Sequence, residues 1–523
     1  MSEEVIVTVH GKFYEQDTFI QRRITAHRGD NLLTVLKKNG YYRRDCSGNG
    51  TCGKCVVRYG KDAPLPTANE RMLLSAQEMR EGIRLACRHA LVRDVEIALC
   101  GAPEKMPDVI VDTGNRGKNA DIITGAGHHT EDTVGNGSVF FAADVGTTTV
   151  VIQAVKKGEV IGTYTALNPQ RCFGADVASR ISAAMQGHGQ ELTEEIRTCL
   201  SEGVRSLICR CGEEPAFMVV VGNTAMNYLL RGLDPDVLGS YPFSPIDTQV
   251  ECMKIRGINC YILPGISAFV GGDITAGILA TGLVVGCPDT MPQTDMGECA
   301  GADATKKSLL VDLGTNGEMV LLSSGRLLCT ATAAGPAFEG SAAGGIMGAD
   351  LIGAAAKLLD RGMLDETGLL AEPYFTEGID VEGFHIRQTD IRELQKAKAA
   401  VSAGISCLCK RAKIAEEEIT TVYLAGGFGY YLDPESAIRI GLFPECFRGK
   451  IKAVGNTALA GAKLLGVKML QESAIMGRLA ESKMERSICS DISDRIREQS
   501  DSINLAEETD FAKIYIERVS FPG

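Results

Sequence analysis

The stretch Cys46-Ser-Gly-Asn-Gly-Thr-Cys52-Gly-Lys-Cys55 decides the fold of the N-terminal region, and a fourth cysteine, Cys87, follows it beyond one more structural element. Glycines in such a loop let the backbone adopt positive φ angles and bring amide N–H groups close to sulfur atoms. Three thiolates in one loop and a fourth beyond it are an arrangement that holds a [2Fe–2S] cluster. We therefore predict that Cys46, Cys52, Cys55 and Cys87 are metal ligands.

The spacing C-x5-C-x2-C is one residue longer in its first gap than the plant-type loop, and it resembles the adrenodoxin variant of that loop. Two other interpretations stay open, a chance grouping among the 18 cysteines and a zinc site. Zinc sites usually pair short C-x2-4-C spacings, which fits this loop less well. An electron carrier needs only a small domain, so the rest of the 523 residues must indicate what the electron is for.

Composition describes an ordinary soluble protein, with 45% hydrophobic and 23% charged residues in a chain long enough for three or four domains. A net charge of −12 and the lack of a basic block argue against a nucleic-acid partner. No apolar run reaches the length of a membrane span, and Met1-Ser-Glu-Glu lacks the features of a signal peptide. We expect a cytoplasmic protein with reduced thiols and no membrane partner.

Residues 1–100 are predicted to form one α+β domain. Val5, Val7 and Val9 alternate with polar residues as in a strand, and residues 19–24 are its expected hairpin partner. Residues 30–40 have the pattern of a short capped helix, and residues 94–98 that of a closing strand. This order resembles the β-grasp ferredoxin fold.

The remaining chain is predicted to contain a linker over 101–137, with a short ordered element at 109–111, and then two α/β lobes. Apolar strands that run into glycine–threonine turns alternate with helices over 138–305 and 306–470, and a polar loop over 286–306 interrupts them. The C-terminal extension, 471–523, is charged and helical to about residue 496, and residues 510–519 are predicted to form a last strand.

Two similar segments carry the nucleotide chemistry. Phe140-Phe-Ala-Ala-Asp144-Val-Gly-Thr-Thr-Thr149 and Leu309-Leu-Val-Asp312-Leu-Gly-Thr-Asn-Gly-Glu318 are each a buried strand that ends in Asp and a glycine–threonine turn. The glycine allows a phosphate to approach the backbone, threonine supplies donors, and aspartate can hold hydrated Mg²⁺. One such turn is weak evidence, but two copies flanked by strands are much stronger. Neither is a Walker loop, because the G-K-[ST] element is missing.

This pairing resembles the superfamily of acetate and sugar kinases, heat-shock proteins and actin, in which two lobes clamp ATP. A third segment, Val422-Tyr-Leu-Ala-Gly-Gly-Phe-Gly429, resembles the adenosine motif of that superfamily. The resemblance implies catalytic roles for the aspartates Asp144, Asp273 and Asp312. It also implies that the nucleotide is bound by Gly146, Thr147, Thr148, Gly314, Thr315, Asn316, Gly335, Gly426 and Gly427.

Asp273 follows Val270-Gly-Gly and is the candidate for orienting the attacking water, although a helix N-cap is the alternative. Gly335 lies in a glycine-rich segment, 334–340, that we expect to line the nucleotide cleft or to face a partner. The small residues of 455–461 are expected to let helices pass closely where the lobes hinge. The C-x-C pairs at 209–211 and 407–409 are more consistent with buried apolar side chains than with a second metal site.

A ferredoxin joined to such an ATPase resembles one family closely, the reductive activators of corrinoid-dependent enzymes. The similar blocks are Arg84–Cys87, Asn168–Arg180, Val221–Met226, Ala333–Gly340 and Leu424–Gly429. The span between Cys87 and Asp144 departs from the family, because longer relatives have a further small domain there. That departure leaves the position of the ferredoxin and its partner contacts open.

The resemblance implies ATP-dependent reduction of Co(II) to Co(I) in a corrinoid protein or methyltransferase, with a [2Fe–2S] cluster, ATP and Mg²⁺ as cofactors and a cellular low-potential electron donor. A plant-type cluster at about −400 mV is a weak donor for such a couple. Two alternatives are a 2-hydroxyacyl-CoA dehydratase type activator and a redox-regulated small-molecule kinase. The cysteine loop argues against the first, and no acceptor motif supports the second. The sequence leaves the partner, the donor and the oligomeric state open, a homodimer being one of the states it allows.

Overall fold

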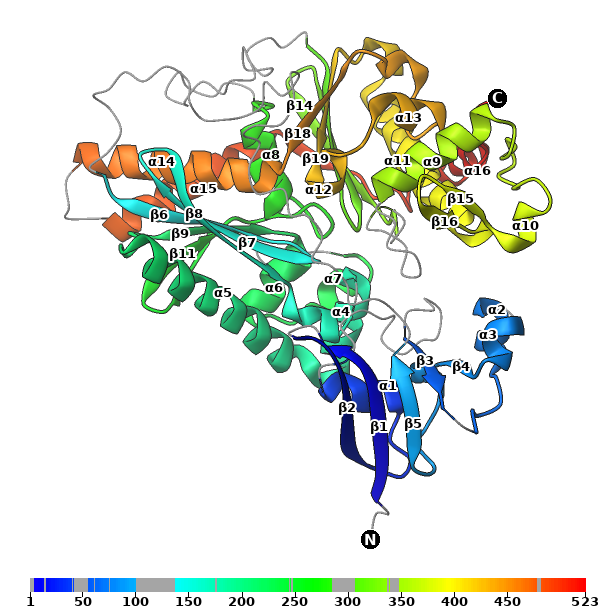
Figure 1. Ribbon diagram of the computed structural model, residues 1–523. Helices are drawn as coiled ribbons and strands as arrows, with labels where there is room; N and C mark the ends of the chain where they lie inside the picture. Colours follow the sequence, from blue (N-terminus) through cyan, green and yellow to red (C-terminus); the bar gives the residue numbers. More distant parts are fainter. Residues whose placement is uncertain are drawn as a thin grey trace. The chain divides into compact units, whose positions relative to one another are not determined.

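The computed structural model describes residues 4–13, 16–39, 41, 55–60, 62–74, 76–99, 137–174, 176–243, 245, 248–284, 306–335, 338, 348–476 and 481–523. The chain divides into two compact units (Figure 1). One comprises Met1–Pro107 and Pro169–Glu195, and the other comprises Asp108–Asn168 and Ile196–Gly523. The segment Pro169–Glu195, which lies inside the predicted first lobe, thus groups with the N-terminal unit.

The N-terminal unit is built on a five-stranded sheet with the order β2-β1-β5-β3-β4. β1 pairs antiparallel with β2 and parallel with β5, which confirms the predicted hairpin and the closing strand of a β-grasp fold. The helix α1 is capped by Asn31, whose side chain accepts a hydrogen bond from the Thr34 N–H. The bounds are β1 (Glu4–Phe13), β2 (Gln16–His27), α1 (Leu32–Lys38), β3 (Val56–Tyr59), α2 (Ala68–Leu73), α3 (Ala76–Arg80), β4 (Ile83–Leu85) and β5 (Val95–Leu99).

The larger unit contains two six-stranded sheets with the orders β10-β11-β9-β6-β7-β8 and β18-β17-β12-β13-β14-β19. Several of their strands are labelled in Figure 1. Their central strands are apolar and almost fully buried, as expected for strands that are covered on both faces. The first sheet consists of β6 (Val139–Val145), β7 (Thr149–Lys156), β8 (Glu159–Leu167), β9 (Met218–Gly222), β10 (Glu251–Ile255) and β11 (Ile258–Ile262). The second consists of β12 (Ser308–Leu313), β13 (Gly317–Ser323), β14 (Arg326–Thr332), β17 (Thr421–Ala425), β18 (Ile451–Gly455) and β19 (Ser500–Ser502).

Helices connect and cover these strands, and a small hairpin, β15 (Ile379–Val381) with β16 (Phe384–Ile386), accompanies the second sheet. The segment grouped with the N-terminal unit contains α4 (Val177–Ala183) and the start of α5 (Gly189–Cys211). The other helices are α6 (Thr224–Arg231), α7 (Asp236–Gly239), α8 (Gly272–Ala280), α9 (Gly348–Asp360), α10 (Tyr374–Glu377), α11 (Gln388–Ala412), α12 (Gly426–Gly429), α13 (Pro434–Arg439), α14 (Thr457–Met476), α15 (Glu481–Gln499) and α16 (Phe511–Val519).

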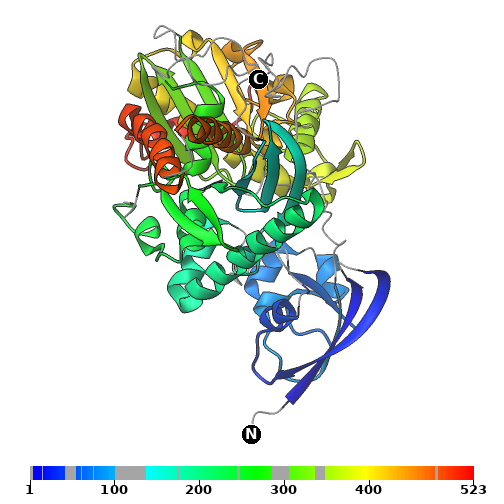
Figure 2. The same ribbon diagram turned by 90° about the vertical axis from the view of Figure 1, so that its left-hand side faces the viewer.

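Two of these helices connect the sheets of the larger unit: α8 and α14 pack against each other, and α8 contacts both β9 and β12 (Figures 1 and 2). Small residues make the close approach possible, because a Cβ atom at Gly461 of α14 would collide with the carbonyl oxygen of Ala276. This crossing bears out the expectation that the small residues of 455–461 let helices pass closely.

The predicted last strand is wrong. Residues Phe511–Val519 form the helix α16, and the C-terminal strand is instead β19, which pairs in parallel with β14. Ile514 of α16 packs with Ala403 and Cys407 of α11, whereas Ile516 is exposed. One buried apolar face is the pattern of a helix, and tertiary packing outweighs the β-branched residues of this segment. The element predicted at 109–111 lies outside the described residues, as does almost all of the predicted loop at 286–306.

Candidate nucleotide and cluster sites

The two predicted phosphate loops are tight turns of antiparallel hairpins. In the first, Val145 pairs with Val150, so Gly146, Thr147 and Thr148 form the connection between β6 and β7. A Cβ atom at Gly146 would lie 2.9 Å from the carbonyl oxygen of Thr149, so this turn requires glycine. Asn168 holds the turn from below, since its side-chain amide donates to the Gly146 carbonyl at 2.8 Å.

The second turn joins β12 to β13. Leu313 pairs with Gly317, which leaves Gly314, Thr315 and Asn316 in the connection, and the Gly314 N–H donates to the Asn316 carbonyl at 2.9 Å. The two hairpins therefore have the same construction, with aspartate as the penultimate residue of the first strand and a three-residue turn of small polar residues.

The three predicted catalytic aspartates lie in one electrostatic group. Asp144 is at the end of β6, Asp312 at the end of β12 and Asp273 in the first turn of α8. Loss of surrounding water raises the pKa of Asp144 to about 6, although a 2.8 Å hydrogen bond from Asn456 opposes this shift. Burial and then the charge of Asp144 raise the pKa of Asp273 to about 7. Burial and the charges of the other two raise the pKa of Asp312 to about 8.

A fourth carboxylate in this group, Glu318, was missed in the sequence. It is the direct antiparallel partner of Asp312, and its side chain is 8% exposed. Burial, followed by the charges of Asp273 and Asp312, raises its pKa well above the usual range. The available signal was a charged residue at the head of an otherwise apolar buried strand, β13.

Four carboxyl groups with raised pKa values favour a cation, which would offset their mutual repulsion. In the described part of the chain, no three His, Cys, Asp or Glu side chains are close enough to hold a metal ion by themselves. Mg²⁺ keeps several waters and is commonly bound by one or two carboxylates together with substrate phosphates. The residues present therefore fit a hydrated Mg²⁺–nucleotide complex.

Asp273 is not a helix N-cap, so that alternative is wrong. Gly271 is the N-cap of α8, and the carboxylate of Asp273 accepts the N–H of Ile274 at 2.8 Å. The preceding loop is closely packed, since a Cβ atom at Gly271 would lie 2.6 Å from the Cα of Asn223 and 2.7 Å from the Asp273 carboxylate. The backbone thus holds Asp273 in place in the first turn of α8.

The third predicted nucleotide element is the turn from β17 into α12. Gly426 has a φ of +91°, and a Cβ atom there would lie 2.6 Å from the Asp312 carboxylate, so glycine brings this turn against the end of β12. Gly427 and Gly335 have no atom within 4 Å of an added Cβ. Most neighbours of Gly335 in the glycine-rich segment lie outside the described residues.

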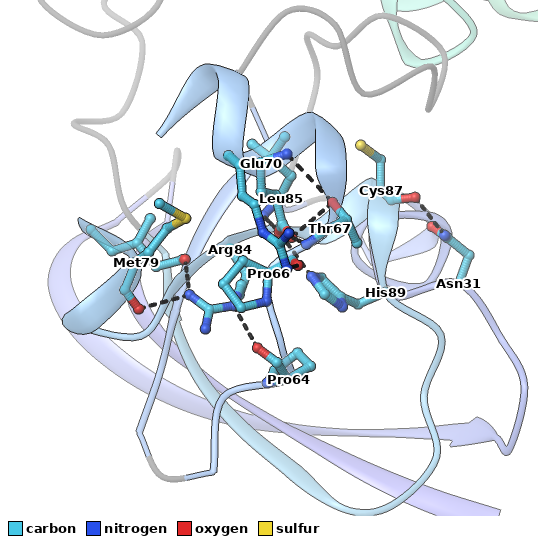
Figure 3. Close-up of polar contacts among 12 residues, drawn as sticks. Asn31, Pro64, Pro66, Thr67, Glu70, Met79, Arg84, Leu85, Cys87 and His89 are labelled. Atoms are coloured by element: carbon cyan, nitrogen blue, oxygen red, sulfur yellow. Dashed lines mark hydrogen bonds and ion pairs between the residues drawn. The ribbon is translucent and has the colours of Figure 1, made fainter. Parts of the chain in front are cut away.

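Two of the four predicted cluster ligands can be placed, and the fold brings them to one end of a strand pair. Cys55 directly precedes β3, and Cys87 follows β4 in a short 3₁₀ turn, Ala86–Arg88. β3 and β4 are antiparallel, and the Ala86 N–H donates to the Cys55 carbonyl at 2.8 Å. Both cysteines are buried, and the Asn31 amide donates to the Cys87 carbonyl at 2.9 Å (Figure 3). Cys46 and Cys52 lie outside the described residues, and the placed pair fits a cluster held between loop and strand.

The Cys407–Cys409 pair is buried as expected, whereas the expectation of burial is wrong for Cys209, which is exposed. Cys407 packs with Leu505 and Ile514, whereas Cys409 belongs to the main core of the second lobe, so the two sulfurs lie on different faces of α11. Burial raises the pKa of the Cys409 thiol to about 12. No helix in the described ranges has the length and apolar character that crossing a membrane requires.

Comparison with known proteins agrees with this architecture. The 2Fe-2S iron-sulfur cluster binding domain matches residues 15–92, the RACo middle region matches 140–285, and the C-terminal domain of RACo, the ASKHA domain, matches 306–344 and 341–523. The chain therefore contains a [2Fe–2S] ferredoxin domain and an ATP-binding domain of the actin and sugar-kinase fold.

Three similar proteins carry related descriptions. The corrinoid activation enzyme RamQ of Eubacterium limosum is 27% identical over 455 residues, which cover 73% of this chain and 70% of RamQ. The [Co(II) methylated amine-specific corrinoid protein] reductase of Methanosarcina barkeri is 26% identical over 262 residues, 40% of this chain and 44% of the relative. A solved structure, the reductive activator for corrinoid,iron-sulfur protein, has 25% identity and a TM-score of 0.60, with 99% of this chain and 98% of that one covered. The ferredoxin fold, the paired nucleotide hairpins and these matches all point to the same family. The chain belongs to the family of reductive activators of corrinoid-dependent enzymes.

Proposed function

We propose that the protein reactivates a corrinoid protein or a corrinoid-dependent methyltransferase by reducing its cobalt from Co(II) to Co(I), one electron at a time, with ATP bound and hydrolysed to drive the change. The observation that carries this proposal is the combination, in one chain, of the buried Cys55 and Cys87 of a ferredoxin fold with two nucleotide hairpins and their carboxylates. The relatives whose printed names include corrinoid activation and Co(II) corrinoid reduction support it.

The need for ATP follows from the redox energetics. A plant-type cluster has a potential of about −400 mV, which is modest for a couple as low as Co(II)/Co(I). Each 59 mV of mismatch costs roughly a factor of ten in the equilibrium of a one-electron transfer. Nucleotide-driven lobe closure supplies the bias by changing the complex with the corrinoid protein.

The cluster ligands in this proposal are Cys46, Cys52, Cys55 and Cys87. When bound, the cluster supplies a one-electron carrier between a cellular low-potential donor and the cobalt substrate. The fold holds Cys87 through the Asn31 hydrogen bond and holds Cys55 through the Ala86 N–H. Fixed ligands reduce the rearrangement that accompanies a change of oxidation state.

In the nucleotide site, Asp144 and Asp312 hold the hydrated Mg²⁺, and Asp273 orients the water that attacks the γ-phosphate. The raised pKa values of these groups support such roles, because a bound cation reverses the cost of ionising them. The phosphates and nucleoside are bound by Gly146, Thr147, Thr148, Gly314, Thr315, Asn316, Gly335, Gly426 and Gly427.

We further expect the protein to act in the cytoplasm and to be able to form a homodimer. In the described ranges the cysteines form no disulfide, as is usual in a reducing compartment. Sedimentation analysis with and without ATP measures the oligomeric state.

The test is a reconstituted reaction of the full-length protein with a chemical reductant, ATP and a Co(II) corrinoid protein encoded nearby, followed by visible absorption. Conversion to Co(I) that depends on ATP supports the proposal. An absence of any ATP effect with every such corrinoid protein refutes it.

Cysteine variants separate the two halves of the reaction. Cys52→Ser and Cys87→Ser should lose cobalt reduction and keep nucleotide binding, because the ferredoxin domain and the hairpins are distinct structures. Cys209→Ser, which changes an exposed thiol, is the matched control and should behave as the unmodified protein.

A further inference from the structure

The N-terminal unit contains a fully buried carboxylate, Glu70, in the short helix α2. One of its oxygens accepts the N–H of Thr67 at 2.7 Å and the Thr67 hydroxyl at 2.9 Å. The other oxygen lies 2.7 Å from the Leu85 N–H, which donates to it, and 2.8 Å from Nε2 of His89 (Figure 3). Four polar groups therefore converge on one side chain.

Helix capping explains only half of this arrangement. Thr67 and Glu70 form a capping box, in which the glutamate needs one oxygen to reach back to the N-cap N–H. The second oxygen contacts Leu85, two residues before Cys87, and His89, two residues after it. Both contacts lead out of α2 to the segment that carries the predicted cluster ligand.

The same segment is anchored from its other side. The Asn31 amide donates to the Cys87 carbonyl at 2.9 Å, and the Leu32 N–H donates to the His89 carbonyl at 3.0 Å. His89 itself is 8% exposed. Glu70 thus contacts this short segment at Leu85 and His89, and Asn31 and Leu32 contact it at Cys87 and His89.

Glu70 keeps its negative charge in this buried place. Burial would raise its pKa, but the hydrogen bonds from Thr67, Leu85 and His89 outweigh burial and leave the pKa below its usual value. A fixed negative charge opposes the addition of an electron to any group nearby. The Glu70 carboxylate therefore both fixes the Leu85–His89 segment by hydrogen bonds and places a negative charge beside it.

We propose that Glu70 and His89 are positioning residues for Cys87, and that the buried Glu70 carboxylate, with its four hydrogen-bonding partners, sets the reduction potential of the cluster. The inference rests on the proposed function in one respect, namely that Cys87 is a cluster ligand. Hydrogen bonds and charges around ligand sulfurs are the usual means by which a protein tunes such a centre. Glu70 lowers the potential, in the direction that Co(II) reduction requires, and the His89 N–H offsets part of that effect.

The test is a redox titration of the full-length protein, with the visible and electron paramagnetic resonance spectra of the cluster recorded. Glu70→Gln removes the charge and keeps the shape, so the midpoint potential should rise by the equivalent of at least a tenfold change in the equilibrium, about 59 mV. The chain offers a matched control in His10 and Glu96, which lie 2.7 Å apart in the same unit and are partly exposed on β1 and β5. Glu96→Gln should leave the potential unchanged.

A second variant should shift the reduction potential in the opposite direction. His89→Asn removes the ring that offsets the carboxylate, so the potential should fall, and the resonance spectrum of the reduced cluster should change. A purely structural role would move the potential in the same direction in both variants or not at all, and either result overturns the proposal. An equal shift in Glu96→Gln also overturns it. If the Glu70→Gln protein fails to assemble a cluster, the His89→Asn protein provides the test. A reduction potential in His89→Asn equal to that of the unmodified protein then refutes the inference.

Failure of this inference is distinguishable from failure of the proposed function. Iron and sulfide content and the visible spectrum of the unmodified protein establish whether a cluster is present. A chain that holds no cluster refutes the proposed function, whereas a normal cluster with an unshifted potential in Glu70→Gln refutes only the role of Glu70.

Discussion

Asp312 of β12 and Glu318 of β13 are direct antiparallel partners, so two carboxyl groups occupy opposed positions in one hairpin. Like charges placed opposite each other destabilise a sheet. Here burial raises the pKa of both groups, and the charges of Asp273 and then Asp312 add to the rise in the pKa of Glu318. Such a pair destabilises the folded protein when no ligand is bound, and a bound divalent cation would offset this repulsion.

Asp312→Asn should stabilise the nucleotide-free protein and abolish its response to ATP. The raised pKa means that ionised Asp312 is unfavourable in the folded state, so a neutral isostere removes that cost at pH 8. The same change removes a carboxylate proposed to hold hydrated Mg²⁺. Thermal unfolding with and without Mg²⁺–ATP measures both effects. An unchanged ATP-induced rise in Tm would contradict the prediction, and the visible spectrum of the cluster should stay normal.

Glu318→Gln should lower ATP turnover by a factor of about 10–100, the usual loss when an outer-shell partner of a metal site is changed, with nucleotide affinity little changed. Glu318 lies beside the carboxylates rather than in the phosphate turns, so its expected effect is on the chemical step. Steady-state hydrolysis and nucleotide titration separate the two quantities. Glu377→Gln, at an exposed position of α10, is the control. Equal turnover in both variants would exclude a role for Glu318.

Tyr261→Phe should loosen the connection between the two lobes. The Tyr261 hydroxyl of β11 donates to Glu485 of α15 at 2.5 Å, and both side chains are buried. The chain then continues into β19, which pairs with β14 of the second sheet, so the segment 481–503 joins both sheets. Loss of this hydrogen bond should cost about 1–3 kcal/mol.

Denaturant unfolding measures that cost, and hydrogen exchange should show reduced protection in α15. Tyr241→Phe, which changes a 76% exposed side chain, should have no effect. Unaltered exchange in α15 of the Tyr261 variant would show that the other contacts of the segment are sufficient.

Lys398 should give the protein a characteristic pH dependence above neutrality. The side chain is 1% exposed, contacts the Ser520 carbonyl and lies 5.0 Å from the centre of the Phe521 ring. Burial lowers its pKa to about 7, with a smaller contribution from Arg518. Between about pH 7 and the unfolded value of about 10.4, the unfolded chain holds a proton that the folded chain has lost.

Stability should therefore increase with pH over this range relative to Lys398→Met, which keeps the stem and has no titrating group. The difference between the urea midpoints of the two proteins, measured from pH 7 to 9.5, isolates Lys398 from the other titrating groups. A difference that does not change with pH would show that Lys398 keeps an ordinary pKa.

Local sequence was sufficient to predict an element wherever a short residue pattern is compatible with only one type of secondary structure or turn. The β-grasp hairpin, the helix capped at Asn31 and the two aspartate–glycine–threonine turns depend on alternation, caps and glycine within a few residues, and all of them form as predicted. The ligand pattern of the cysteine loop is likewise local, which is why it identified the ferredoxin domain. The C-terminal helix α16 was mistaken for a strand because β-branched residues favour strands until a packing surface, here α11, decides otherwise.

Tertiary structure alone decided which distant residues share an environment. Nothing near Glu318 in the sequence shows that it adds to the field of Asp273, because that depends on where α8 begins relative to the β12–β13 hairpin. Glu70 and His89 likewise meet only when α2 packs beside β4, which turns a helix cap into a contact on both sides of Cys87. The sequence by itself thus determined the two kinds of site in this protein, the cysteine loop of the ferredoxin domain and the aspartate–glycine–threonine turns of the nucleotide site. The fold decided the electrostatic surroundings of each, since charges act through space and not along the chain.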